Sequence, residues 1–467
     1  MANGTVDRVI HGGTVVTATA AFEAAVAIDG EQITAVGHRE NLPEGREEVD
    51  ASGKYVFPGA IDCHVHLGLE DWEQGSRAAA RAGLTTIIPF VSYNAPQEET
   101  LPAAIERITA KVSTASVVDV SLNFILTNTP YVLESLPEAM RMGVRAYKAF
   151  MTYKRWGTLM SPDASIAAAM EVIAREGGLM QLHCENGEVL DYLQQRAITE
   201  GRTQPRDYSA TCPPWAEAEA VNRAILLAEM TGCPLYVVHL STRDGLELIR
   251  EAQRAGQAVW AETCPQYLLL DESEMERLGP LAKIGPPLRP TDRLHQGAMW
   301  QGVEQGDVAI VSSDHSPAAK ELKESGWDNI FEGPDGRTIP YGSPSMETLV
   351  PLAYGEGVAK RGLPATWMAR VLAENPARLF GLYPRKGTIQ PGSDADLLII
   401  DPDAEWTISA ADHVGNAGYT PYEGWPVRGR PWMTLLRGRV LLGDGDLAEA
   451  PGYGRFVAAG GPQPAVS

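Results

Sequence analysis

The feature that most constrains the fold is a series of eight apolar segments between residues 60 and 314, separated by helical or loop sequence. Short apolar runs rich in Val, Ile, Leu and aromatic residues are typical of buried parallel strands. Helical periodicity lies between them, as in "EETLPAAIERITAKV" and "EAEAVNRAILLAEMTG". Eight strands that alternate with helices predict an α/β protein with a (β/α)8 barrel. The expected strands are 60–67, 85–91, 118–126, 144–150, 178–184, 235–240, 258–264 and 308–314.

The two ends of the chain follow a different pattern from the middle. Residues 1–55 contain short alternating segments, and Asp29-Gly30 is a strong hairpin signal. Hairpin-like strands return past residue 385, in "KGTIQPGSDADLLIIDPD" and "WMTLLRGRVLLGDG". We therefore expect 1–55 and 385–450 to form one small β-sandwich domain beside a barrel at 56–384. Residues 451–467 are expected to form a C-terminal tail, and its Gly/Pro/Ala segment "AAGGPQPAVS", residues 458–467, is expected to be loose.

Charge, hydrophobicity and cysteine content limit the possible binding partners and the cellular compartment of the protein. A net charge of −21 argues against a broad basic surface for nucleic acid or anionic membrane. No apolar run approaches the roughly 20 residues of a membrane span, and the N-terminus lacks the pattern of a signal peptide. Five scattered cysteines without a CxxC argue against a disulfide framework, so we expect a cytoplasmic protein.

Ionisable side chains gather at the C-terminal ends of the expected strands. His64 and His66 form an HxH, and period-two geometry points both to one face. In a barrel, C-terminal strand ends converge on one mouth, where the active sites of this fold lie. One such residue is a weak signal, but six in matching positions indicate a metal site. The others are Lys148, His183, His239 and Asp314.

The ligand chemistry favours two metals. Imidazole and carboxylate suit zinc or another divalent first-row ion, and five such groups exceed the three protein ligands of a catalytic zinc. Two adjacent cations repel each other and need a bridging anion. Lys148 shares a strand face with apolar residues, where an ammonium is costly to bury. Carboxylated by CO2, its amine would become a carbamate that bridges the two metals.

These motifs carry a resemblance. The order HxH, Lys, His, His, Asp resembles the binuclear amidohydrolase superfamily. The words "GAIDCHVHL", "AYKAFMTYK", "LHCENGEVL" and "SSDHSP" resemble its hydantoinase/dihydropyrimidinase/allantoinase branch. The resemblance implies that His64, His66 and Asp314 bind one metal, that His183 and His239 bind the second, and that N6-carboxylated Lys148 bridges them.

The resemblance also implies the reaction. A metal-bridging hydroxide would open the cyclic amide ring of hydantoins or dihydropyrimidines and give N-carbamoyl amino acids. Asp314 would transfer the proton, and Tyr153 would polarise the substrate carbonyl. The cofactors implied are two divalent ions, zinc first and manganese or cobalt as alternatives, with CO2 on Lys148. The family further implies a homotetramer or homodimer.

Three departures leave the substrate open. The helical sequence follows the HxH almost at once, where dihydropyrimidinases insert a longer loop. Gly285 replaces a common serine and Tyr341 stands near a common asparagine, so both are candidate substrate contacts. Allantoinase remains an alternative. An L-type hydantoinase is another, because Gly326-Trp327 resembles the "GW" that follows the aspartate loop in that type. Gly68 replaces the arginine expected of a dihydroorotase. The alternative from another class is a non-catalytic, dihydropyrimidinase-like scaffold.

Overall fold

A computed structural model describes residues 4–68, 70–92, 99–126, 130–448 and 450–466. Its central sheet is parallel, and β10 and β11 together occupy the third position of eight around the barrel. Residues Val65 and His315 form a parallel bridge between the first and last positions, which closes the barrel. The strands are β8 (Ala60–Val65), β9 (Leu84–Val91), β10 (Asp119–Val120), β11 (Asn123–Ile125), β12 (Ala146–Phe150), β13 (Leu179–His183), β14 (Leu235–Val237), β15 (Val259–Thr263) and β16 (Ile310–Val311).

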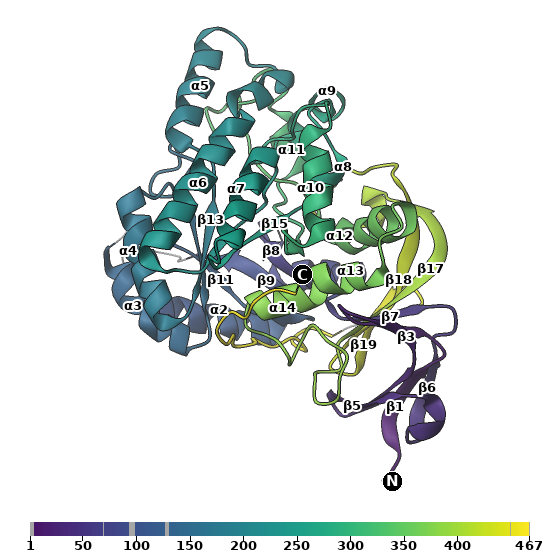
Figure 1. Ribbon diagram of the computed structural model, residues 1–467. Coiled ribbons are helices and arrows are strands. Elements are labelled where there is room, and N and C mark those ends of the chain that lie inside the picture. Colours follow the sequence, from purple (N-terminus) through teal and green to yellow (C-terminus); the bar gives the residue numbers. More distant parts are fainter. Residues whose placement is uncertain (1–3, 69, 93–98, 127–129, 449, 467) are drawn as a thin grey trace.

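Helices cover the outside of this sheet (Figure 1). The longer ones are α1 (Trp72–Ala82), α2 (Leu101–Ala115), α3 (Pro130–Arg141), α4 (Asp163–Glu176), α5 (Gly187–Thr199), α6 (Pro214–Thr231), α7 (Arg243–Arg254) and α10 (Leu294–Gln305). Shorter ones are α8 (Pro265–Leu269), α9 (Glu274–Arg277), α11 (Lys320–Glu324), α12 (Met346–Leu352), α13 (Ala365–Ala369) and α14 (Asn375–Leu379). Segment η5 (Ala353–Lys360) continues α12, and η6 (Arg370–Glu374) joins α13 to α14. Single turns are η1 (Arg39–Asn41), η2 (Pro205–Asp207), η3 (Ser209–Thr211), η4 (Gly279–Ala282) and η7 (Ala410–Asp412).

Two further sheets come from both ends of the chain and lie together beside the barrel (Figure 1). The first has the order β5 (Gln32–Gly37), β4 (Ala25–Asp29), β1 (Val6–His11), β6 (Gly45–Asp50). The second has the order β20 (Asp446–Leu447), β19 (Arg439–Gly443), β18 (Pro426–Leu436), β17 (Leu397–Thr407), β7 (Tyr55–Pro58), β2 (Thr14–Val16), β3 (Ala21–Glu23). Buried side chains of both sheets, such as Ile28 and Leu397, share one apolar cluster. The predicted barrel with a β-sandwich of the two termini is confirmed, while the exact domain bounds stay predictions.

A buried ionic cluster joins the barrel to the sandwich. The Lys386 ammonium lies 2.7 Å from Asp119 Oδ2 of β10 and 2.6 Å from Asp396 Oδ2. Arg437, which follows β18, also pairs with Asp119. Three carboxylates meet here, and the third, Asp394, lies 3.1 Å from the same ammonium, so Lys386 pairs with all three. The cluster therefore serves as a structural joint between the two domains.

The C-terminal segment is not loose, so that expectation was wrong. Backbone amides of residues 454–463 donate to carbonyls along the bottom of the barrel, for example Val457 to Val120 at 2.7 Å and, within the segment expected to be loose, Gly460 to Gly381 at 2.8 Å. These hydrogen bonds fix a segment whose Gly, Pro and Ala content alone suggests disorder. Its Val457 joins Phe380, Ile61 and Tyr236 in one buried cluster. Apolar side chains thus fill the floor of the barrel.

All five cysteines are free and buried. Among the described residues, no helix combines the length and apolar composition needed to cross a bilayer.

Candidate active site

The six candidate ligands lie at the C-terminal side of the barrel strands. His64 is in β8 and His66 follows it, Lys148 is in β12, and His183 ends β13. His239 and Asp314 lie just beyond β14 and β16, since these strands end earlier than predicted. Both have positive φ, at 39° and 50°, which is uncommon outside glycine. Such strain is typical of residues that the surrounding structure holds for function.

The structure brings all six side chains together. The imidazole centroids of His64 lie 5.4 Å from His66 and 5.2 Å from His239, and those of His183 and His239 are 4.4 Å apart. His64 Nε2 lies 3.0 Å from Lys148 Nζ and 3.1 Å from Asp314 Oδ1. The donor atoms of His64, His66 and Asp314 all lie within 4.8 Å of one another, so these three residues could hold a metal ion.

Electrostatics keep three of the four imidazoles neutral. Burial and Lys148 lower the pKa of His66 well below its ordinary value. Burial, His183 and Lys148 do the same to the pKa of His239. Burial also lowers the pKa of His183, against the effect of a nearby carboxylate. A neutral imidazole keeps the nitrogen lone pair that a metal needs.

His64 is held by a glutamate that the sequence interpretation missed. Buried Glu262 of β15 accepts a hydrogen bond from His64 Nδ1. It also accepts from the Tyr236 hydroxyl at 2.8 Å and from the His239 backbone N–H at 3.2 Å. This fixes the His64 tautomer and leaves Nε2 free as a ligand, as is usual for carboxylates behind metal-binding histidines. The sequence contains a signal for Glu262, because this acid lies inside an apolar strand segment, as Lys148 does.

Glu185 was also missed, and it plays the same part for His183. Its Oε2 accepts from His183 Nε2 at 2.7 Å, which leaves Nδ1 of that ring free. Nδ1 of His239 is buried without a hydrogen-bond partner among the described residues. Neutral imidazoles with held tautomers, an unpartnered ring nitrogen and a nearby carboxylate fit a divalent cation.

Lys148 lies in the middle of this group and is fully buried. Its Nζ is 4.2 Å from the ring centre of Phe90 and 4.9 Å from that of Phe150. Burial lowers the pKa of the amine to about 8, although Asp314 and Glu262 oppose the shift. The lysine therefore faces the histidines, and its strand face is the one expected.

Tyr153, Gly285 and Tyr341 meet beside the histidines. The Tyr153 ring centre lies 5.1 Å from that of His183 and 5.2 Å from that of Tyr341. A Cβ atom on Gly285 would lie only 2.6 Å from the Tyr153 hydroxyl oxygen. Burial raises the pKa of Tyr153 well above its ordinary value, so its phenol is a hydrogen-bond donor at neutral pH. Its φ of 67° is a further point of strain.

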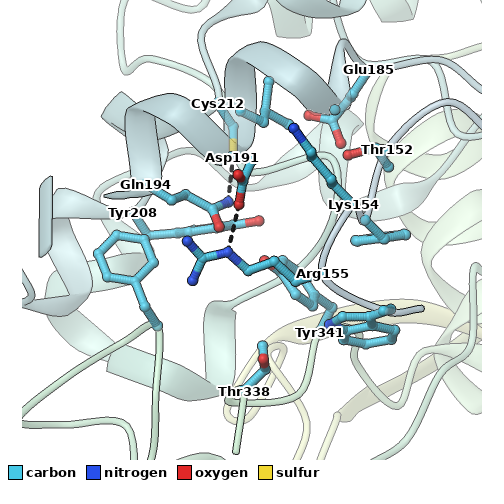
Figure 2. Close-up of a pocket in the computed structure, with 15 residues that line it drawn as sticks. Thr152, Lys154, Arg155, Glu185, Asp191, Gln194, Tyr208, Cys212, Thr338 and Tyr341 are labelled. Carbon is cyan, nitrogen blue, oxygen red and sulfur yellow. Dashed lines mark hydrogen bonds and ion pairs between the residues drawn. The ribbon is translucent and has the colours of Figure 1, made fainter. Parts of the chain in front are cut away.

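A cavity adjoins these residues (Figure 2), and its empty space of about 550 Å³ includes the part that is open to solvent. Tyr153 and Glu185, which both contact His183, form part of its wall. The rest comes from the loop after β12, from α5, and from residues near Tyr208 and Tyr341. The lining residues used below are Arg155, Trp156, Asp191, Gln194, Tyr208 and Tyr341.

Comparison with known proteins agrees with this site. The model of the amidohydrolase family matches residues 55–441. A D-hydantoinase of Geobacillus stearothermophilus is 38% identical, with 96% of each chain covered. An allantoinase of Rubrobacter xylanophilus is 37% identical over 97% of each. The crystal structure of a dihydropyrimidinase from Brevibacillus agri superposes with a TM-score of 0.91 at 35% identity, covering 97% of this chain and 99% of that one. The chain therefore belongs to the amidohydrolase family.

Proposed function

We propose that this protein is a metal-dependent cyclic amidohydrolase that opens the ring of hydantoins or dihydropyrimidines and releases N-carbamoyl amino acids. The observation that carries the proposal is the meeting of His64, His66, His183, His239, Lys148 and Asp314 next to the Tyr153 phenol. Relatives named D-hydantoinase and L-hydantoinase, at 38% and 33% identity, support this reaction class.

The metal ligands divide into two sets. His64, His66 and Asp314 would hold one divalent ion, and His183 and His239 the other, with N6-carboxylated Lys148 shared between them. Zinc suits these donors best, with manganese or cobalt as alternatives. When bound, such ions supply Lewis acidity and lower the pKa of water.

The chain's own groups orient the substrate and move the proton. Tyr153 donates a hydrogen bond to the ring carbonyl oxygen and stabilises the charge that develops there. Asp314 takes the proton of the attacking water and passes it to the leaving ring nitrogen. Gly285 and Tyr341, which both lie beside Tyr153, would contact the ring. Glu262 and Glu185 keep His64 and His183 in the correct tautomers.

Substitution of Lys148 tests the proposed bridge. We expect Lys148→Ala to lose the second metal and ring-opening activity, with partial rescue by propionate, which replaces the missing anion. The measurements are metal content per chain and turnover of hydantoin and dihydrouracil with zinc, manganese or cobalt. Wild-type metal content and turnover in the variant would refute the bridge. A wild-type protein that opens no five- or six-membered cyclic amide would refute the proposed function.

Allantoinase is the second candidate, because an allantoinase relative is nearly as similar as the first D-hydantoinase. Allantoin in the substrate panel separates the two. A non-catalytic scaffold remains the alternative from another class. It would purify without two tightly held metals per chain, whereas we expect two.

Assembly and location stay proposals as well. We expect a homotetramer or homodimer, which light scattering after size-exclusion chromatography would measure. We expect the protein in the cytoplasm, where fractionation of the source cells would find it.

A further inference from the structure

The cavity beside Tyr153 is placed to receive a substituent carried by the substrate ring. Its wall includes Tyr153 and Glu185, and both contact His183. The space between the loop after β12 and helix α5 therefore lies beside a ring whose carbonyl is at the Tyr153 phenol, within reach of an exocyclic group. The side chains of that space decide which substituents bind well.

The cavity wall includes Arg155, whose terminal N–H groups are available to a ligand. Nε of Arg155 donates to Asp191 of α5, which anchors the guanidinium (Figure 2). Its two terminal nitrogens donate to no group in the described part of the chain. Helix α5 is itself fixed at its start, because the Asn186 side chain accepts from the Val189 N–H at 3.2 Å. Arg155 therefore presents a planar pair of N–H donors from a fixed anchor.

Polar groups of other elements surround this guanidinium. Figure 2 shows its terminal nitrogens directed to the side of the cavity where Gln194 and Tyr208 lie. Burial raises the pKa of Tyr341 well above its ordinary value, against a hydrogen bond with Gln194 and the positive charge of Arg155. Both groups therefore act on the Tyr341 phenol. Of the remaining charges on the cavity wall, Lys154 pairs with Glu188 and Glu185 binds His183.

The aromatic walls favour a flat group. The Tyr153 and Trp156 rings stack at 5.2 Å, and Trp156 meets the Tyr341 ring edge-on at 5.7 Å. The Tyr208 and Tyr341 ring centres are 6.0 Å apart. Flat aromatic faces suit a planar substituent, while its edge receives the N–H groups of Arg155. The Arg155 side chain is partly exposed, so a hydrocarbon in the same place would displace water from those donors and offer them no acceptor.

We propose that Arg155 is a specificity-determining residue that selects substrates whose ring substituent ends in a planar group with a carbonyl or carboxylate oxygen. The inference rests on the proposed function, because it concerns the same site. Asp191 balances part of the Arg155 charge, so a neutral amide or ureido group and a carboxylate share the required chemistry: an oxygen acceptor on a planar carbon.

The test compares three hydantoins that differ only at the end of the substituent. They carry 2-carboxyethyl, 2-carbamoylethyl and 3-methylbutyl groups, which have nearly equal size. With wild-type enzyme we expect kcat/KM to be at least tenfold higher for one or both polar substrates than for the hydrocarbon. The better polar substrate identifies the natural substituent as charged or neutral. Equal kcat/KM for all three would overturn the proposal.

Variants attribute the preference to Arg155. We expect Arg155→Met to reduce the polar-to-hydrocarbon ratio of kcat/KM to within about threefold of one, and Asp191→Asn to raise the carboxyethyl-to-carbamoylethyl ratio. Arg196→Met is the matched control, because Arg196 is an exposed arginine of α5, the helix that carries Asp191, and lies outside the cavity lining. It should leave every ratio unchanged. An unaltered ratio in Arg155→Met would refute the role of Arg155.

Failure of the proposed function gives a different result. In that case the wild-type protein opens neither unsubstituted hydantoin nor dihydrouracil. Isothermal titration of 5-(2-carboxyethyl)- and 5-(2-carbamoylethyl)hydantoin then tests Arg155 directly. Binding of at least one that weakens at least tenfold in Arg155→Met supports the inference, and equal or absent binding refutes it.

Discussion

Replacement of Glu262 by glutamine tests whether the carboxylate behind His64 prepares the metal centre. Glu262 is fully buried and accepts from the His64 ring, the Tyr236 hydroxyl and the His239 backbone. Glutamine has nearly the same size, but it has one acceptor oxygen and an amide that donates. At least one of those three donors would lose its partner, and His64 would no longer be held in one tautomer.

The magnitude follows from what such carboxylates contribute elsewhere. Loss of a carboxylate that orients a metal-binding histidine costs roughly 10–100-fold in metal affinity or activity, which is about 1.4–2.7 kcal/mol. We expect zinc affinity, measured by competition with a chromophoric chelator, to fall by that factor in Glu262→Gln. The kcat/KM of hydantoin should fall with it.

Glu217→Gln is the matched control for this experiment. Glu217 is another buried carboxylate, but it accepts from Ser241 and Thr242 and contacts no imidazole in the described part of the chain. This control should lower the free energy of unfolding and leave zinc affinity unchanged. Zinc affinity within twofold of wild type in Glu262→Gln would refute the reasoning.

Three further predictions concern stability, packing and metal removal. Burial lowers the pKa of Lys283 to about 7, so between pH 7 and 9 the unfolded chain binds more protons and the stabilising contribution of this lysine rises with pH. In urea unfolding, the free energy of unfolding of wild type minus that of Lys283→Met should rise by about 2 kcal/mol from pH 7 to pH 9. A difference that does not change with pH would contradict the prediction. Gly285→Val, which is larger than the serine common in the family, should displace Tyr153 and lower kcat/KM at least tenfold, while Gly297→Ala, with open space around it, should not. Chelation should abolish ring opening and added zinc, manganese or cobalt restore it, and full activity after verified metal removal would exclude metal dependence.

Sequence predicted the architecture because buried parallel strands leave a distinct apolar pattern. The strand ends were less predictable: β14 ends at Val237 and β16 at Val311, and beyond them His239 and Asp314 adopt positive φ, which is uncommon for residues other than glycine. The candidate ligands could be named because strand ends converge in a barrel, although their roles stay predictions. Glu262 could have been found by the same test as Lys148, a charge inside an apolar strand.

Other features depend on contacts that no local pattern encodes. The joint between Asp119, Lys386 and Arg437 unites residues from distant parts of the chain. The C-terminal segment is ordered because its backbone amides find carbonyls under the barrel, such as that of Val120. Composition describes what a segment contains, whereas its order depends on the partners that the fold supplies.

The filled floor of the barrel has a consequence for how substrate enters and product leaves. Among the described residues, the side chains of Ile61, Tyr236, Phe380 and Val457 fill that end of the barrel, so we expect the active site to open only at the other end, where the strands end. The intact ring must enter, and the opened chain must leave, along the same path. Substrate and product therefore cannot occupy the active site at the same time. We expect the ring-opened product to be a competitive inhibitor of the forward reaction. We also expect product release to limit kcat at saturating substrate.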